Sequence, residues 1–236
     1  MAARRDGPPV RPAARRRLHC QRLGGLIEPL DRAGLDAAVA QLASRDADLA
    51  GIVERYGLPP LWDRAPGFGT LVHLILEQQV SLASAQAAFD RLITASGGAL
   101  APSRLLAFDD AELLAIGFSR QKARYARALA SAVGSGALDI DGLAGLDDDE
   151  VRRALEAMPG IGPWTSSIYL LMVLGRPDVW PVGDVALAQA AAEVRGLDHR
   201  PDADELRAIG EAWRPWRSVA ARLLWHDYLG RRGRPG

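Results

Sequence analysis

Residues 155–167, "LEAMPGIGPWTSS", contain the turn that decides the fold. A charged, amphipathic segment ends before Pro159, Gly160-Ile161-Gly162 turns the chain, and Pro163 starts the next segment at a position that favours a helix start. The pattern predicts two helices joined by a tight, Gly-rich hairpin, with Ile161 anchored in the core.

The hairpin has the properties of a phosphate-binding surface. Glycines let a backbone surface approach a ligand closely, and the N–H groups at the next helix start present donors and a positive dipole end to an anion. Such contacts carry no base-sequence information and suit a protein that scans duplex DNA. Thr165, just inside the second helix, is a candidate for an added hydroxyl contact to phosphate. The alternative is a tight αα-turn without a ligand, because Gly-rich turns between helices are common.

The rest of the chain has helical periodicity. Apolar residues recur at spacings of three and four, and alternating runs of the strand type are absent. The periodic segments are 35–43, 46–56, 68–93, 109–117, 119–133, 147–158, 163–174, 184–194, 203–213 and 215–229. The sequence therefore predicts an all-α fold of roughly ten short helices on short connections.

Helix start and stop residues agree with this pattern. N-caps are expected at Asp46, Asp109, Ser119 and Asp147, prolines in the first turn at 163 and 215, and helix ends at Gly57, Gly97, Gly117 and Gly134.

The expected organisation is one helical domain behind a tail. Residues 1–25, rich in Arg, Pro and Ala, predict a flexible tail. Residues 26–236 predict a domain of two packed helical lobes with the hairpin at a central cleft, the second lobe covering roughly 80–185.

Composition excludes several kinds of site. Cys20 is the only cysteine, so the chain has no disulfide framework and no Cys-ligated zinc or four-cysteine iron–sulfur cluster of its own. The four histidines lack ligand spacing, so no metal held by side chains is expected. Formal net charge is zero, but acidic and arginine-rich segments are separate along the chain, so a basic face can coexist with an acidic one.

No segment approaches the roughly eighteen consecutive apolar residues of a membrane span, and the N-terminus lacks the apolar stretch of a secretory signal. We expect a soluble, cytoplasmic protein without a membrane role, monomeric, and nucleoid-associated if it acts on DNA.

About twenty residues after the hairpin, the chain breaks at Pro-Val-Gly and presents Asp184. With this aspartate, the stretch resembles the helix-hairpin-helix DNA glycosylase superfamily, and within it the 3-methyladenine DNA glycosylase II branch. Segments 74–85, 117–129 and 213–229 are also similar to that branch. Residues 26–60 predict two helices, as in compact members without the N-terminal β-rich domain.

The resemblance implies a monofunctional enzyme of base excision repair. Bifunctional members carry a lysine two residues after the second hairpin glycine, where this chain has Trp164, and the only lysine, Lys122, lies elsewhere. Expected is hydrolytic excision of flipped-out alkylated purines of the 3-methyladenine type from double-stranded DNA containing damaged bases. Two alternatives are a uracil or mismatched-thymine glycosylase on the same fold and a non-catalytic helix-hairpin-helix DNA-binding protein.

Asp184 is the candidate catalytic residue. Cleavage of an N-glycosidic bond builds positive charge on the sugar, which a nearby carboxylate stabilises. An aspartate before residues 185–194 is also an ordinary N-cap, and the two roles are compatible.

The resemblance also assigns the base pocket. Trp164 and Trp225 match pocket tryptophans, with a place in the hydrophobic core as the alternative for both, and Ile168 stands where some relatives carry a tyrosine. On a helix starting at Pro215, Trp225 lies about 180° from Trp216 and so off the main core face.

The resemblance implies two further features. Gln79 matches the residue that fills the gap left by the flipped base, with Gln78 as the neighbouring candidate; the alternative is a buried or capping glutamine in a long helix. No cofactor is expected apart from a monovalent cation on hairpin backbone carbonyls near Glu156, Met158 and Ile161.

Overall fold

The computed structural model describes residues 28–233, and within this range it contains helices and no strand. The helices are α1 (Arg32–Ala43), α2 (Ala47–Tyr56), α3 (Phe68–Glu77), α4 (Leu82–Ala95), α5 (Pro102–Leu106), α6 (Asp110–Ile116), α7 (Arg120–Gly134), α8 (Asp148–Glu156), α9 (Pro163–Ile168), α10 (Val185–Arg195), α11 (Ala203–Glu211) and α12 (Arg217–Arg231), with a 3₁₀ helix at Asp141–Gly145 and a π-helix at Tyr169–Val173. The all-α prediction is confirmed. The predicted tail, residues 1–25, lies outside the described range.

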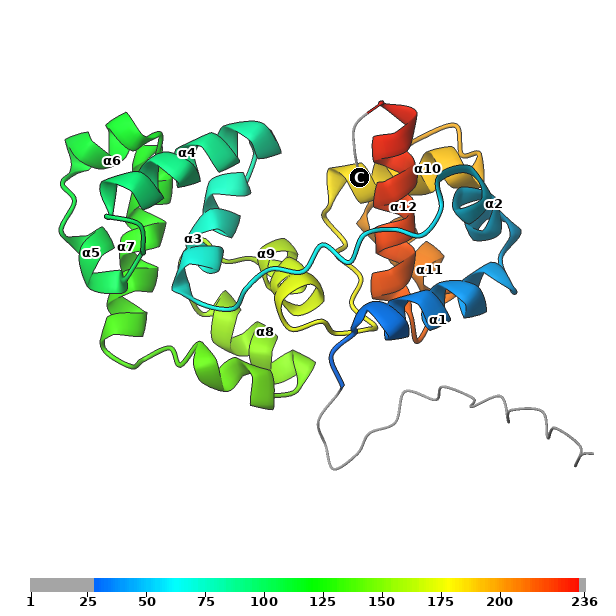
Figure 1. The fold of residues 1–236 in the computed structure, drawn as a ribbon, viewed down its shortest axis with the longest axis horizontal. Helices are drawn as coiled ribbons and strands as arrows, with labels where there is room; N and C mark the ends of the chain where they lie inside the picture. Colours follow the sequence, from blue (N-terminus) through cyan, green and yellow to red (C-terminus); the bar gives the residue numbers. More distant parts are fainter. Residues whose placement is uncertain (1–27, 234–236) are drawn as a thin grey trace, which may run out of the picture.

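Helix contacts divide the described residues into two groups. α12 packs on α1, α2, α10 and α11, so residues from both ends of the described range form one group. α3 to α7 form the other, and α8 and α9 lie between the two (Figure 1). Because α3 packs on α4 and α7, the second group starts at Phe68 in the structure, earlier than the position near 80 expected from the sequence. No helix in the described range is long and apolar enough to span a membrane.

Local signals account for most helix ends. Asp46, Asp109, Ser119 and Asp147 each accept a backbone hydrogen bond as N-caps, as predicted. Pro163 is in the first turn of α9, as predicted. The short helix α5 was not predicted, since five residues carry too little periodicity to detect.

One predicted helix is two helices in the structure. Residues 68–93 have continuous helical periodicity, but α3 ends at Glu77 and α4 begins at Leu82. Gln79 has a left-handed backbone, with φ at 58°, and Ser81 caps α4 by accepting a hydrogen bond from the Ser84 N–H. The N-cap at Ser81 is the sequence signal for a second helix start, and the continuous apolar periodicity concealed it.

Helix α12 differs from its prediction in two ways. It begins at Arg217 with Trp216 as N-cap, so Pro215 precedes the helix instead of occupying its first turn. Every residue from Ser218 to Trp225 is buried, and the side chain of Trp225 is only 8% exposed. The predicted single core face is wrong because α12 is surrounded by four helices of its group.

A buried arginine joins the segments that cross between the groups. The Arg222 side chain, 1% exposed, donates hydrogen bonds to the carbonyls of Leu61 at 2.7 Å and Leu171 at 2.9 Å. Leu61 belongs to the linker between α2 and α3, and Leu171 to the π-helix that follows α9. Burial lowers the pKa of Arg222 to about 10, so the guanidinium is still protonated at neutral pH.

Candidate active site

Asp184 lies at the N-terminus of α10 and is held by three hydrogen bonds. Its Oδ1 caps the helix by accepting from the Leu187 N–H at 2.7 Å. The indole N–H of Trp164 donates to Oδ2 at 2.9 Å, and the indole N–H of Trp225 donates to Oδ1 at 3.2 Å. The structure therefore brings together the three residues that the sequence assigned to catalysis and to the base pocket.

The two tryptophans meet Asp184 through the edges of their rings. A carboxylate accepts about four hydrogen bonds, and three of these positions are filled here by donors from α9, α10 and α12. The carboxylate is thus fixed in direction while its side chain stays only half-buried. The sequence assigned both tryptophans to the base pocket alone; their indole N–H groups also orient the candidate catalytic acid.

The hairpin has the geometry that its glycines predict. Gly160 has a left-handed backbone, with φ at 86°, and a Cβ at this position would lie 2.2 Å from the ring of Tyr125 on α7. Ile161 is 3% exposed and anchors the turn in the core. Gly162 is the N-cap of α9, and a Cβ there would meet nothing within 4 Å. Gly160 is thus required by packing, whereas Gly162 leaves the backbone accessible.

Thr165 does not have its predicted role. Its side chain is 2% exposed, and its hydroxyl oxygen accepts a hydrogen bond from Gln78 Nε2 at 3.1 Å. A contact to a phosphate is excluded in this arrangement because the hydroxyl points into the protein. Gln78 Nε2 also donates to the Gly160 carbonyl at 2.7 Å, so Thr165 and Gln78 together tie α9 and the hairpin to the end of α3.

The two glutamine candidates have different surroundings. Gln78 is half-buried and occupied by the hairpin, while Gln79 is exposed at the left-handed break between α3 and α4. Only Gln79 projects from the surface beside the hairpin, so it is the better candidate to fill a gap in a duplex. Its wedge role stays a prediction, as does the cation on the hairpin carbonyls.

Ile168 is buried, at 3% exposure, in the last turn of α9. A π-helix follows it directly, and π-helical turns are frequent at functional sites. No sequence signal indicated this irregularity, and the contribution of Ile168 to base selection stays a prediction.

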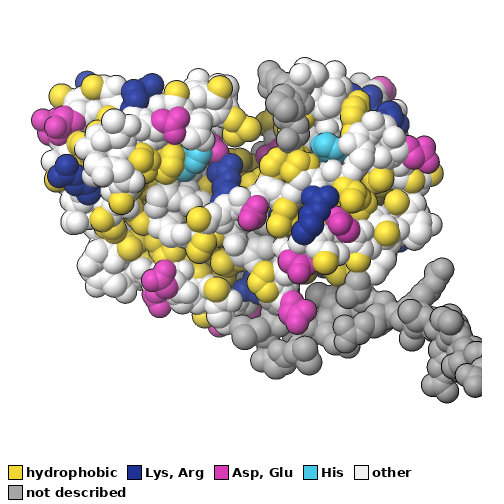
Figure 2. All heavy atoms as spheres, in the orientation of Figure 1, with side chains coloured by type: hydrophobic (Ala, Val, Ile, Leu, Met, Phe, Trp, Pro, Cys, Tyr) yellow, Lys and Arg dark blue, Asp and Glu magenta, His cyan; other side chains and the backbone are white. Residues whose placement is uncertain are grey.

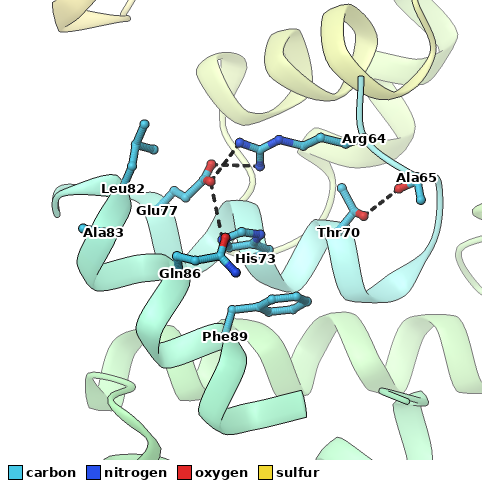
Figure 3. A pocket seen from close by; sticks show the side chains of 9 residues that line it. All are labelled: Arg64, Ala65, Thr70, His73, Glu77, Leu82, Ala83, Gln86 and Phe89. Atoms are coloured by element: carbon cyan, nitrogen blue, oxygen red, sulfur yellow. Dashed lines mark hydrogen bonds and ion pairs between the residues drawn. The ribbon is translucent and has the colours of Figure 1, made fainter. Parts of the chain in front are cut away.

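A groove with a volume of about 640 Å³ lies along α3 and α4. It is lined by Arg64, Ala65, Thr70, His73, Glu77, Leu82, Ala83, Gln86 and Phe89 (Figure 3). Arg64 makes a bidentate ion pair with Glu77, and the His73 ring stacks on Phe89 at 4.4 Å. Burial lowers the pKa of His73, although Glu77 opposes the shift. Asp184 and its tryptophans do not line this groove, so it is not the pocket that the sequence predicted.

Lys122, the only lysine of the chain, is on α7 and donates from Nζ to the Leu76 carbonyl at 2.7 Å. Burial lowers its pKa. The amine is engaged at the end of α3 and has no contact with Asp184 or the hairpin among the interactions described.

The face of the molecule in Figure 2 carries no basic patch that would indicate a DNA-binding surface. Acidic and basic side chains are intermixed on this face and do not gather into one basic patch (Figure 2). This agrees with the formal net charge of zero.

Fold and site together define a helix-hairpin-helix protein with an aspartate fixed beside the hairpin. A profile of the HhH-GPD superfamily of base excision DNA repair proteins matches residues 72–215. The chain belongs to this superfamily.

Individual relatives agree. The crystal structure of a DNA-3-methyladenine glycosidase from Bacillus halodurans is 35% identical, with a TM-score of 0.69 over 81% of this chain and 88% of that one. DNA-3-methyladenine glycosylase 2 of Escherichia coli is 29% identical over 75% of this chain and 64% of its own. A Mycobacterium tuberculosis protein named "Probable bifunctional transcriptional activator/DNA repair enzyme AlkA" is 35% identical over 80% of this chain and 42% of its own. The chain thus spans less than two thirds of these two curated relatives.

The fold is also shared with a 3-methyladenine DNA glycosylase from the yeast Schizosaccharomyces pombe, solved with abasic DNA. That chain is 24% identical, with a TM-score of 0.72 over 80% of this chain and 95% of its own. At this identity the comparison supports the fold.

Proposed function

We propose that the protein is a monofunctional DNA glycosylase that excises alkylated purines of the 3-methyladenine type from double-stranded DNA, leaving an abasic site. The observation that carries the proposal is Asp184, half-buried and held between Trp164, Trp225 and the first turn of α10. The names of the Bacillus halodurans and Escherichia coli relatives support the substrate class.

The site supplies what the reaction requires. As the base departs, the sugar develops an oxocarbenium-like charge, and a carboxylate of fixed direction stabilises that charge without reorganising. An alkylated purine is cationic, so its N-glycosidic bond is weakened and the base leaves without strong acid catalysis. A single carboxylate is therefore sufficient, and the half-buried indole of Trp164 beside it offers electron-rich surface to a cationic base.

The arrangement of amines supports hydrolysis without strand cleavage. Trp164 occupies the position at which a lyase needs its lysine, and the amine of Lys122 is bonded to the end of α3. No lysine is therefore placed to form a Schiff base with the sugar at Asp184.

Further parts of the proposal follow from the same site. Asp184 and both tryptophans come from one chain, which supports action as a monomer. Damaged duplex would bind through the hairpin backbone, with Gln79 entering the gap left by the flipped base. Its DNA substrate supports the proposal that the protein acts at the nucleoid.

The test is a base-release assay on duplexes carrying 3-methyladenine, 7-methylguanine, hypoxanthine, an etheno base or uracil, with wild type and Asp184→Asn. The variant should release 3-methyladenine about 10²–10³-fold more slowly, because the developing charge loses its counter-charge. Its melting temperature should fall only modestly, since asparagine keeps the helix cap, while its amide NH2 cannot accept the hydrogen bond from the Trp164 indole.

Asp109→Asn is the matched control, because Asp109 caps α6 away from the site. It should leave release unchanged. Absence of methylated-base release by wild type would remove the proposed substrate, and preferential release of uracil would reassign it. Equal rates for wild type and Asp184→Asn would remove the proposed mechanism.

A further inference from the structure

A third tryptophan, Trp62, adjoins the site from a segment that sequence reasoning did not single out. It lies on the linker between α2 and α3. Its ring meets that of Trp225 edge to face, with centroids 6.5 Å apart and planes at 72°, and contacts the ring of His226 at 6.4 Å. Trp225 is the residue whose indole N–H donates to Asp184. The ring of Trp225 therefore connects Trp62 to the candidate catalytic carboxylate.

Trp62 has an unfavourable backbone conformation. Its φ is 48°, in the left-handed region that favours glycine and is costly for a bulky side chain. Among the described residues, only Trp62 and Gln79 combine a positive φ with a residue other than glycine. Gln79 is the wedge candidate. The two residues with a strained backbone therefore lie on either side of α3, Trp62 before the helix and Gln79 after it.

The surrounding structure holds the linker in this conformation. The Leu61 carbonyl accepts from the buried Arg222 at 2.7 Å, and the Arg64 N–H donates to the Met172 carbonyl at 2.9 Å. The Arg64 guanidinium is in turn clamped by Glu77 (Figure 3). The chain is thus fixed on both sides of Trp62, and the strain is maintained by groups that are themselves buried or paired.

Trp62 packs against the hydrophobic core, but core packing alone does not require a tryptophan with this backbone. Its side chain is only half-buried, and a glycine would adopt the same backbone without strain. Strained positions that the rest of the fold maintains are concentrated at functional sites. An exposed aromatic surface beside Trp225 is one that a ligand can use.

We propose that Trp62 is a specificity-determining residue of the base pocket, which supplies an aromatic wall for a cationic purine beside Asp184. The proposal rests on the proposed function. The near-perpendicular planes of Trp62 and Trp225 form a corner, so a base stacked on one indole presents its edge to the other. Positive charge on the base strengthens its attraction to an indole face, so this wall favours cationic alkylated purines over neutral lesions.

The test compares single-turnover release of 7-methylguanine, a cationic base, with release of hypoxanthine, a neutral one, for wild type, Trp62→Leu and Trp62→Phe. Trp62→Leu should lower the rate of 7-methylguanine release about tenfold and that of hypoxanthine release much less. Trp62→Phe should keep most of the wild-type ratio of the two rates. Quenching of tryptophan fluorescence by free 3-methyladenine should weaken in the same order.

Trp216→Phe is the matched control. Trp216 is a buried tryptophan at the start of α12, and its indole N–H donates to Gln41. It should leave the ratio of the two rates unchanged.

A Trp62→Leu ratio equal to that of wild type, or a loss of melting temperature without a change in ratio, would overturn the assignment of Trp62. Absence of release by wild type would instead overturn the proposed function, so the two failures are distinguishable. If Trp62→Leu does not fold, the Phe variant and the quenching measurement decide.

Discussion

At the scale of single residues, Asp184 has a local role and a chemical one at the same time. Capping needs one carboxylate oxygen directed at the Leu187 N–H, which leaves the other free to face Trp164. The helix start therefore positions the acid without a separate structural device. This is why the cap and catalytic interpretations of the sequence do not compete.

The two hairpin glycines give a prediction at this scale. Gly160→Ala should destabilise the protein by about 2–4 kcal/mol, because it combines a left-handed backbone with a methyl group placed against the Tyr125 ring. Gly162→Ala should cost less than about 1 kcal/mol, since its φ of −107° suits alanine and no atom lies near the added methyl group.

Urea denaturation of both variants measures the difference. Equal destabilisation by the two substitutions would show that the hairpin does not pack on α7 as described. Affinity for duplex DNA, measured in parallel, should fall for Gly160→Ala even where the variant remains folded, because the backbone surface of the turn shifts.

At the scale of elements, the break between α3 and α4 is the feature that apolar periodicity missed. Every residue from Leu74 to Glu77 is buried, and an apolar pattern resumes after Leu82, so local sequence favours one helix. Gln78 holds the end of α3 to the hairpin by bonding to the Gly160 carbonyl and Thr165. The break thus serves to join α3 and α9, and it leaves Gln79 exposed.

The break predicts a separation of stability from activity. Gln79→Gly should keep or raise the melting temperature, because glycine adopts a φ of 58° without strain. Base release from duplex DNA should fall about tenfold or more, since no side chain remains to fill the gap left by the flipped base. Release from a single-stranded substrate should change little.

Gln79→Ala serves as the second variant, because it also removes the side chain but keeps a residue other than glycine at a φ of 58°. It should lose duplex activity to the same extent without the gain in stability. Full duplex activity in both variants would exclude Gln79 as the wedge.

At the scale of the whole molecule, Arg222 joins segments that are far apart in the sequence. Its guanidinium bonds to Leu61 in one crossing segment and Leu171 in another, and it projects from α12 at the centre of the group that contains both ends of the described range. The relative position of Trp62, Trp225 and Asp184 depends on this connection.

Arg222→Met should therefore lower the free energy of unfolding by about 2–5 kcal/mol, because two buried carbonyls lose their donor. Arg207→Met is the control, since Arg207 is exposed and pairs with exposed Asp204; its effect should stay within about 0.5 kcal/mol. Chemical denaturation of both variants provides the comparison. Similar midpoints would contradict the role of Arg222 in joining the two groups.

Much of the protein could be predicted from local signals. Helical periodicity, the caps at Asp46, Asp109, Ser119 and Asp147, and the Pro and Gly residues of the hairpin act within a few positions of one another, so they are evident in the linear chain. The position of Asp184 after the hairpin was evident for the same reason. Trp164 and Trp225 were assigned by resemblance, and their hydrogen bonds to the carboxylate were not foreseen.

The sequence by itself determined the all-helical class, the hairpin and the aspartate that follows it, because these depend on short-range backbone preferences. Only the tertiary structure decided that Thr165 is buried, that Gln78 and Gln79 have different roles, and that Trp62 reaches Trp225. Each of these depends on which distant helix packs against the residue in question. Such contacts arise from the simultaneous packing of many side chains, which no local pattern records.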